Sequence, residues 1–389
     1  MSPQALSARY AFYYVAVFLS VGAYLPFWPL WLESRGLTAG EIGLLLALAA
    51  WVKVVVNPGL AHISDRAGWG KGSIVLLAAV SLCAFAAFAS VSGFLWVLVV
   101  QLVVAASFPL LVPLGESQTM VAVYRYSLDY GRIRLWGSLA FIGGSIAAGW
   151  MIGALSVDWV LWLILTALVL TFLAALALPG RGASTAKAEA REELSLRRLF
   201  RLFGQPGFLA FLVAAALIQA SHAAYYGFSS LHWRANGIGE TAIALLWTEG
   251  VVAEILFFAV SHRLARRFSP AALLVAAGLL GLLRWSVLGL STDLVLLAAV
   301  QPLHAATFAA THLAAMHYIT RATPAALSAS MQSLYSALSG GLAMGGAMLL
   351  AGRLYESDPG FAFYAMAGIA LVAVVLAVAS GLLRRPQPA

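Results

Sequence analysis

Apolar runs of about 20 residues recur along the chain, separated by short polar connections. An α-helix rises about 1.5 Å per residue, so a run of this length crosses the roughly 30 Å hydrocarbon core of a bilayer. We therefore predict membrane-spanning helices rather than buried helices of a soluble domain. Twelve are expected, at residues 9–31, 41–63, 72–92, 94–116, 134–156, 158–178, 207–231, 240–262, 270–290, 294–316, 328–351 and 361–383.

Composition places the chain in the same class. Of its 389 residues, 62% are hydrophobic and 10% charged, and the mean hydropathy is +0.92. Soluble proteins carry roughly 25% charged residues. The fold class expected is an all-α membrane protein. The single cysteine, Cys83, excludes an intrachain disulfide.

Lysine and arginine are concentrated in the connections that follow even-numbered spans, and at both termini. Cytoplasmic loops are enriched in these residues, so both termini are predicted to be cytoplasmic, which requires an even number of spans. The formal net charge of +8 then reflects topology and contact with anionic lipid headgroups, and nucleic acid is not an expected partner.

One connection, 179–206, is much longer than the others. Its first part is small and charged, as in a linker, and LSLRRLFRLFG then places apolar residues on one face, as in an interfacial helix. We predict an N-terminal bundle over 1–178, this cytoplasmic linker, and a C-terminal bundle over 207–389. A faint repeat, AHISDRAG at 61–68 and SHRLARRF at 261–268, supports a duplicated six-helix unit.

Six plus six helices, a central linker and DRAG after the second span resemble the major facilitator superfamily. Longer blocks resemble its lactose-permease-like branch, and within it the bacterial 3-phenylpropionate transporters. These blocks are YLPFWPLWL, LDYGRIRLWGS, HAAYYGFSSLHW, GVVAEILFFAVS and LHAATFAATHLAAMHYI. The resemblance implies two pseudo-symmetric six-helix bundles that alternate around a midplane cavity, and proton-coupled uptake across the bacterial inner membrane. It also implies that Asp65 and Arg66 act in the cytoplasmic gate.

Arg132 and Arg134 stand at the mouth of the fifth span. Arg132, close to Asp129, is expected to be a surface anchor. Arg134 lies one turn deeper, and Glu116 ends the preceding span, so the two side chains are expected within pairing reach. In the lactose-permease-like pattern such a pair contributes to the substrate site, and a guanidinium fork suits a carboxylate. Two interpretations stay open: Arg134 binds substrate with Glu116, or the pair is structural.

Aromatic and polar residues in the seventh and first spans are the other substrate-site candidates. His222 and Tyr226 belong to a stripe that we expect to line the cavity, whereas Trp233 at its end fits an interfacial belt. Around the prolines of the first span, Tyr24 and Trp28 are expected to form aromatic walls. With an anion-binding group, such walls suit an aromatic carboxylate.

Proton coupling requires an ionisable group that senses the cavity, and Glu249 is the expected proton carrier. Helical geometry turns Glu254 about 140° away, so we expect it on another face. His304 matches a histidine of the family pattern and is a candidate for substrate and proton alike. Thr307 stands where that pattern has a glutamate, and Arg284, whose counterpart sits near that acid, is expected to pair with Glu254.

Other chemistries find little support. The sequence has no Gly-rich phosphate loop, so ATP-driven transport is not expected. Its histidines and cysteine show no metal-ligand spacing, so no metal is expected. We expect a transporter and no enzyme, with no cofactor beyond the proton gradient. The prediction is a monomeric transporter of a small aromatic carboxylate, in contact with membrane lipid. The alternatives are a sugar or nucleoside symporter, and a lipid flippase, exporter or sensor on the same fold.

Overall fold

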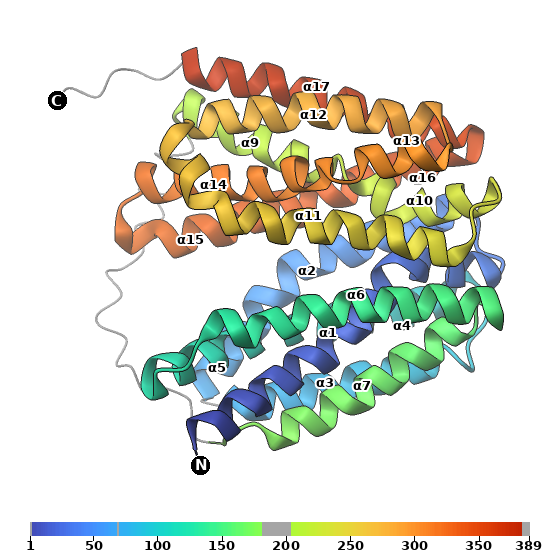
Figure 1. Cartoon of the computed structure of the whole chain (residues 1–389), viewed down its shortest axis with the longest axis vertical. Coiled ribbons are helices and arrows are strands. Elements are labelled where there is room, and N and C mark those ends of the chain that lie inside the picture. The colour runs from blue at the N-terminus through green and yellow to red at the C-terminus, as the bar shows by residue number, and fades with distance from the viewer. Residues whose placement is uncertain (1, 68–69, 181–203, 383–389) are drawn as a thin grey trace. The chain divides into compact units, whose positions relative to one another are not determined.

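The computed structural model describes residues 2–67, 70–180 and 204–382, which form helices joined by short turns (Figure 1). Twelve helical stretches of the described chain are long and apolar enough to cross a membrane, as predicted. Most of the predicted linker and interfacial helix lies outside the described residues, as do the side chains of Asp65 and Arg66.

The first six spans lie within the first 180 residues. They are α1 (Pro3–Ser34), α2 (Ala39–Ala67), α3 (Gly70–Ala87), α4 with η1 and α5 (Phe94–Ser107, Phe108–Leu110, Leu111–Tyr126), α6 (Tyr130–Ala154) and α7 (Trp159–Ala177). The fourth span is thus ten residues longer than predicted. Glu116 is therefore well inside α5, not at its end.

Three of the second six spans are interrupted. The seventh consists of α9 (Pro206–Ala220) and α10 (Ala223–Ala235), while the eighth and ninth are single helices, α11 (Glu240–Arg267) and α12 (Pro270–Leu290). Two π-helical segments, η2 (Ala305–Ala309) and η3 (Ala337–Ala343), interrupt the tenth and eleventh spans. The remaining elements are α13 (Leu294–Val300), α14 (Ala310–Ala322), α15 (Ala325–Ser336), α16 (Met344–Ser357) and α17 (Pro359–Leu382).

Polar side chains set several helix starts. The carboxylate of Asp129 accepts from the Arg132 backbone N–H at 3.1 Å, and the hydroxyl of Ser269 accepts from the Ala272 N–H at 3.2 Å. Such caps satisfy N–H groups that have no partner inside the helix. α6 consequently begins at Tyr130, so Arg134 lies in its second turn.

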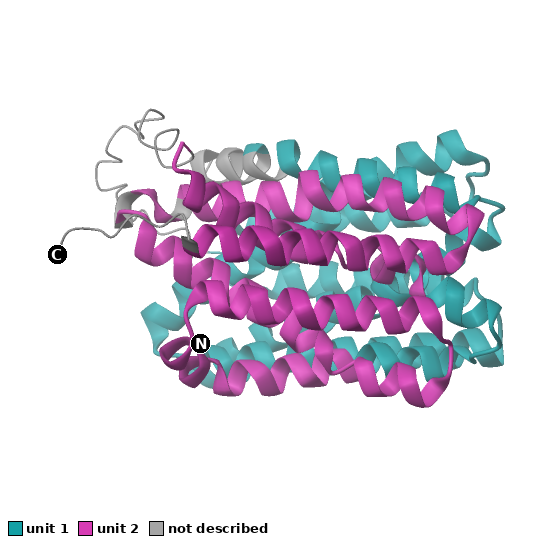
Figure 2. Cartoon of the chain, turned by 90° about the horizontal axis from the view of Figure 1, so that it is seen from above, with its two compact units in different colours: residues 1–187, 230–248 teal, residues 188–229, 249–389 magenta. Residues whose placement is uncertain are grey.

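The chain clusters into two compact units, residues 1–187 with 230–248, and residues 188–229 with 249–389 (Figure 2). The same kinds of helix pair contact in each. The first span packs on the fifth and sixth, and the third on the sixth; the seventh span likewise packs on the eleventh and twelfth, and the ninth on the twelfth. This repeated pairing is what a duplicated six-helix unit predicts.

Glycines allow close contact between α1 and α6 in the first unit. A Cβ added to Gly22 of α1 would collide with the carbonyl oxygen of Phe141 on α6, and one added to Gly144 of α6 would lie 2.5 Å from the carbonyl oxygen of Leu19. Only glycine fits such backbone-to-backbone contact. In the second unit, apolar residues of α9, α12, α14, α15 and α17 form one buried core.

Candidate functional site

The predicted pair of Arg134 and Glu116 is present in the first unit. Arg134 Nε lies 3.4 Å from Glu116 Oε1, with 30% and 36% of the two side chains exposed. The guanidinium also lies over the ring of Phe18, 4.2 Å from its centroid. These contacts confirm the ion pair; a further contact with substrate stays a prediction. Arg132, 88% exposed, pairs with Asp129 at 3.4 Å as expected of a surface anchor.

Trp28, which was expected in an aromatic wall with Tyr24, is packed inside the first unit. Trp28 is 1% exposed, and its ring stacks on Tyr24 and Trp31 at centroid distances of 5.4 and 4.6 Å. Its indole N–H donates to Gln101 Oε1 at 3.0 Å, and Gln101 Nε2 donates to the Tyr24 hydroxyl at 2.9 Å. Gln101 was not among the predicted site residues. It is a single amide in an apolar run, and it lies buried between Trp28 and Tyr24.

The seventh span breaks at the residues that the polar stripe singled out. α9 ends at Ala220 and α10 begins at Ala223, so Ser221 and His222 lie at the junction. His222 is fully buried, and Tyr226, one turn on, is partly exposed. Trp233 is also fully buried inside the protein, so its assignment to a lipid-interface belt is wrong.

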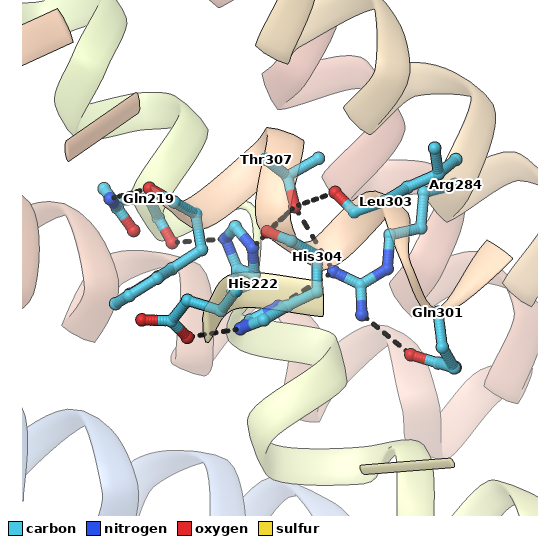
Figure 3. Close-up of polar contacts among 9 residues, drawn as sticks. Gln219, His222, Arg284, Gln301, Leu303, His304 and Thr307 are labelled. Atoms are coloured by element: carbon cyan, nitrogen blue, oxygen red, sulfur yellow. Dashed lines mark hydrogen bonds and ion pairs between the residues drawn. The ribbon is translucent and has the colours of Figure 1, made fainter. Parts of the chain in front are cut away.

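Arg284 of α12 is the centre of a polar cluster that lies entirely within the second unit (Figure 3). The residue is 0% exposed. Nη1 donates to His304 Nδ1 at 3.1 Å and to Thr307 Oγ1 at 3.3 Å, and Nη2 donates to Gln301 Oε1 at 2.9 Å. His222 Nε2 contacts the same hydroxyl of Thr307 at 3.0 Å. We call these five residues the Arg284 cluster.

The partners fix the proton positions on both histidines. An arginine side chain only donates, so His304 Nδ1 accepts, and the proton of the neutral imidazole is on Nε2. His222 Nδ1 lies 3.1 Å from two backbone carbonyl oxygens of the preceding turn, which only accept, so this nitrogen carries the proton. Its Nε2 then accepts from Thr307. Protonation of His304 Nδ1 therefore breaks its hydrogen bond with Arg284. Protonation of His222 Nε2 instead reverses its hydrogen bond with Thr307 Oγ1, which can then donate to the Leu303 carbonyl.

Local helix geometry supports this arrangement. Thr307 lies in the π-helical segment η2, and such bulges redirect side chains and recur at functional sites. Aromatic rings cover the guanidinium, whose carbon lies 4.6 Å from the Tyr225 centroid and 4.7 Å from that of Trp285. Gln301 and the bulge were both missed in the sequence, where this segment is an ordinary apolar run.

α11 brings Glu254, not Glu249, to the cluster. Glu254 Oε2 lies 3.8 Å from His304 Nε2, and its side chain is 25% exposed. His304 thus stands between Arg284 and Glu254, which corrects the expected direct pair of these two residues. Glu249, partly exposed on a different face of α11, is within electrostatic range of Tyr225.

No group of three or more histidine, cysteine, aspartate or glutamate side chains in the described ranges is arranged to hold a metal ion. The candidate chemistry of the described site is therefore that of one buried cation, two imidazoles, two amide or hydroxyl groups and a nearby carboxyl group. Such groups bind anions and move protons.

Known proteins were compared with the chain. The model of the MFS_1 like family matches residues 5–365. The "Probable 3-phenylpropionic acid transporter" of Escherichia coli (strain K12) is 35% identical over 371 residues, covering 93% of this chain and 95% of its own. Maltose permease of Geobacillus stearothermophilus is 26% identical over 350 residues, covering 88% and 86%.

Solved structures show the same fold. The crystal structure of the nucleoside transporter NupG matches with a TM-score of 0.85 at 16% identity, covering 98% of this chain and all of that one. A bacterial homologue of the human lysosomal transporter Spinster matches with a TM-score of 0.68 at 15% identity, covering 98% and 96%. The chain therefore belongs to the MFS_1-like family and is a multi-pass membrane transporter with the major facilitator fold.

Proposed function

We propose that this transporter couples uptake of a small aromatic monocarboxylate, 3-phenylpropionate or a close relative, to protons. It would work by alternating access in the bacterial inner membrane, with both termini in the cytoplasm. The observation that carries the proposal is the 35% identity, over 93% of the chain, to the Escherichia coli protein named for this substrate.

The chemistry of the Arg284 cluster and its rim supports an aromatic anion. Arg284 supplies a buried positive charge. Two partly exposed rings lie beside it: Tyr226 stacks on His222 with centroids 5.6 Å apart, and Phe308 stacks on His304 with centroids 5.3 Å apart. A ring with an attached carboxylate finds both a stacking surface and a cation here.

We assign the proton to Glu254 in preference to Glu249. Glu254 is the carboxyl group next to the imidazole that contacts Arg284. Protonation of this carboxylate removes a negative charge from the neighbourhood of a buried guanidinium, and therefore changes the charge balance that an incoming anion meets. Glu249 is connected to Arg284 only through the side chain of Tyr225, and not through a group that can take up a second proton near neutral pH, as the imidazole of His304 can.

The test compares Glu254→Gln with Glu249→Gln in proteoliposomes. A glutamine mimics the protonated acid, and exchange of labelled for unlabelled substrate needs only the loaded, protonated carrier to reorient. Glu254→Gln should therefore keep counterflow but lose accumulation driven by a pH gradient, whereas Glu249→Gln should keep both. The reverse pattern would return the proton to Glu249. Wild-type vesicles that accumulate no aromatic carboxylate would overturn the function itself.

A proton-coupled sugar transporter is the second candidate, supported by the 26% identity to maltose permease. The two candidates differ in charge: a sugar is neutral, and would leave the buried guanidinium without a counter-anion. A thermal-shift screen of the purified protein against 3-phenylpropionate, maltose and uridine separates them. Stabilisation by maltose alone would replace the carboxylate proposal.

A further inference from the structure

Two hydrogen-bond donors of the Arg284 cluster are left without acceptors. Arg284 Nε and Gln301 Nε2 are buried and have no hydrogen-bond partner among the described residues, and both residues are 0% exposed. A buried N–H without an acceptor loses its hydration and gains nothing in return. The two donors belong to side chains joined by the 2.9 Å bond from Arg284 Nη2 to Gln301 Oε1.

The charge of Arg284 is also uncompensated. Its partners are the imidazole of His304, the hydroxyl of Thr307, the amide of Gln301 and the side chain of Tyr225, all neutral. No carboxylate of the described residues lies within ion-pair distance of the guanidinium. Glu254 contacts His304, and it is the His304 ring that contacts Arg284. A buried charge is unfavourable unless an opposite charge accompanies it. Arg134, by contrast, already has the carboxylate of Glu116 beside it.

We propose that Arg284 and Gln301 form the subsite for the substrate carboxylate, with Arg284 Nε and Gln301 Nε2 as its donors. This inference rests on the proposed function and assigns the anion-binding role to the second unit, not to Arg134. A guanidinium binds a carboxylate side-on through Nε and one Nη, the arrangement that the free Nε leaves available. The ring of the substrate would then lie against Tyr226 and Phe308, the partly exposed aromatics next to the cluster.

Gln301→Glu tests the subsite because it places a carboxylate of the protein itself beside Arg284. The new carboxylate would stand where Oε1 now accepts from Arg284 at 2.9 Å, and would compete with the substrate for the same cation. The variant should fold at least as stably as the wild type. Its affinity for 3-phenylpropionate should fall at least about tenfold, or about 1.4 kcal/mol.

Three probes make the measurement specific to the carboxylate: 3-phenylpropionate, its neutral amide and chloride, each titrated calorimetrically into purified protein. The wild type should bind the acid at least about tenfold more tightly than the amide, and Gln301→Glu should remove this preference without changing affinity for the amide. Gln101→Glu is the matched control. This variant replaces another buried amide, which accepts from the indole N–H of Trp28, by a carboxyl group. It should leave the preference for the acid over the amide ligand intact.

Each outcome decides the inference. A folded Gln301→Glu protein that retains the preference for the acid overturns the subsite and leaves the proposed function standing. Chloride that competes with the acid on equal terms makes this a halide site instead. A wild type that binds no aromatic carboxylate overturns the function and the inference together. If Gln301→Glu does not fold, Gln301→Met serves in its place, because methionine has a similar volume but no N–H donor. This variant should lower the affinity for 3-phenylpropionate but not the affinity for its neutral amide. An equal loss of affinity for both ligands would refute the assignment.

Discussion

Gly143 and Gly144 are adjacent in α6, but a methyl group would meet very different surroundings at the two positions. At Gly144 it would lie 2.5 Å from the carbonyl oxygen of Leu19 on α1, whereas at Gly143 it would meet nothing within 4 Å. Ordinary contact begins at 3.4 Å, so Gly144→Ala requires α1 and α6 to separate by about 0.9 Å.

Backbone atoms form the obstacle, so no side chain can rotate out of the way. Gly22 makes a second contact of the same kind one turn along α1, with the Phe141 carbonyl, and separating the helices disturbs both. Overpacking of this kind costs about 1–3 kcal/mol, and we expect Gly144→Ala near the upper end. Gly143→Ala should change the free energy of unfolding by no more than about 0.5–1 kcal/mol, in the stabilising direction because alanine favours helix.

The assay is unfolding of the two purified variants and the wild type in one detergent, by heat and by titration with sodium dodecyl sulfate. The intrinsic fluorescence of the 12 tryptophans reports the transition. Gly144→Ala should unfold at lower temperature and lower denaturant than Gly143→Ala. Equal midpoints for the two variants would refute the close backbone contact between α1 and α6.

Three further substitutions have defined outcomes. Gln101→Leu removes the acceptor of the Trp28 indole N–H, so stability in detergent should fall by about 1–3 kcal/mol; an unchanged midpoint would contradict the packed arrangement. Arg134→Lys keeps the charge opposite Glu116 and should lower 3-phenylpropionate affinity by less than about threefold, whereas a loss of tenfold or more would move the carboxylate to this arginine. Asp65→Asn, by its resemblance to the family gate, should slow counterflow in vesicles while equilibrium affinity changes by no more than about threefold; lost binding in a folded protein would exclude a gating role.

The spans and the ion pair of Arg134 with Glu116 were predictable because both depend on local sequence. A span is recognised from length and hydropathy, and all twelve expected spans are present. α5 and α6 are joined by three residues, of which Ser127 has a left-handed backbone (φ 51°) and Asp129 caps the next helix. So short a connection makes the two helices antiparallel neighbours and brings their polar side chains together.

The helix faces were not predictable in the same way. In a membrane, residues that contact lipid and residues that contact another helix are equally apolar, so hydropathy does not show which way a helix is turned. The sequence therefore did not show that Trp28, expected in an aromatic wall, is packed against neighbouring rings. For the same reason hydropathy does not show that Glu254 faces His304 on α11. Gln101 and Gln301 are likewise single polar residues in apolar runs, with no sequence signal for the partners that they contact.

What the sequence by itself determined is thus the class of protein, the number of spans and the types of side chain available. The surroundings of Arg284 were decided by tertiary structure alone. A break after α9 and a π-helical segment at Thr307 rotate His222 and Thr307 toward a guanidinium on α12. Packing among several helices fixes these rotations, because each helix is stable in several orientations on its own and only its neighbours select one.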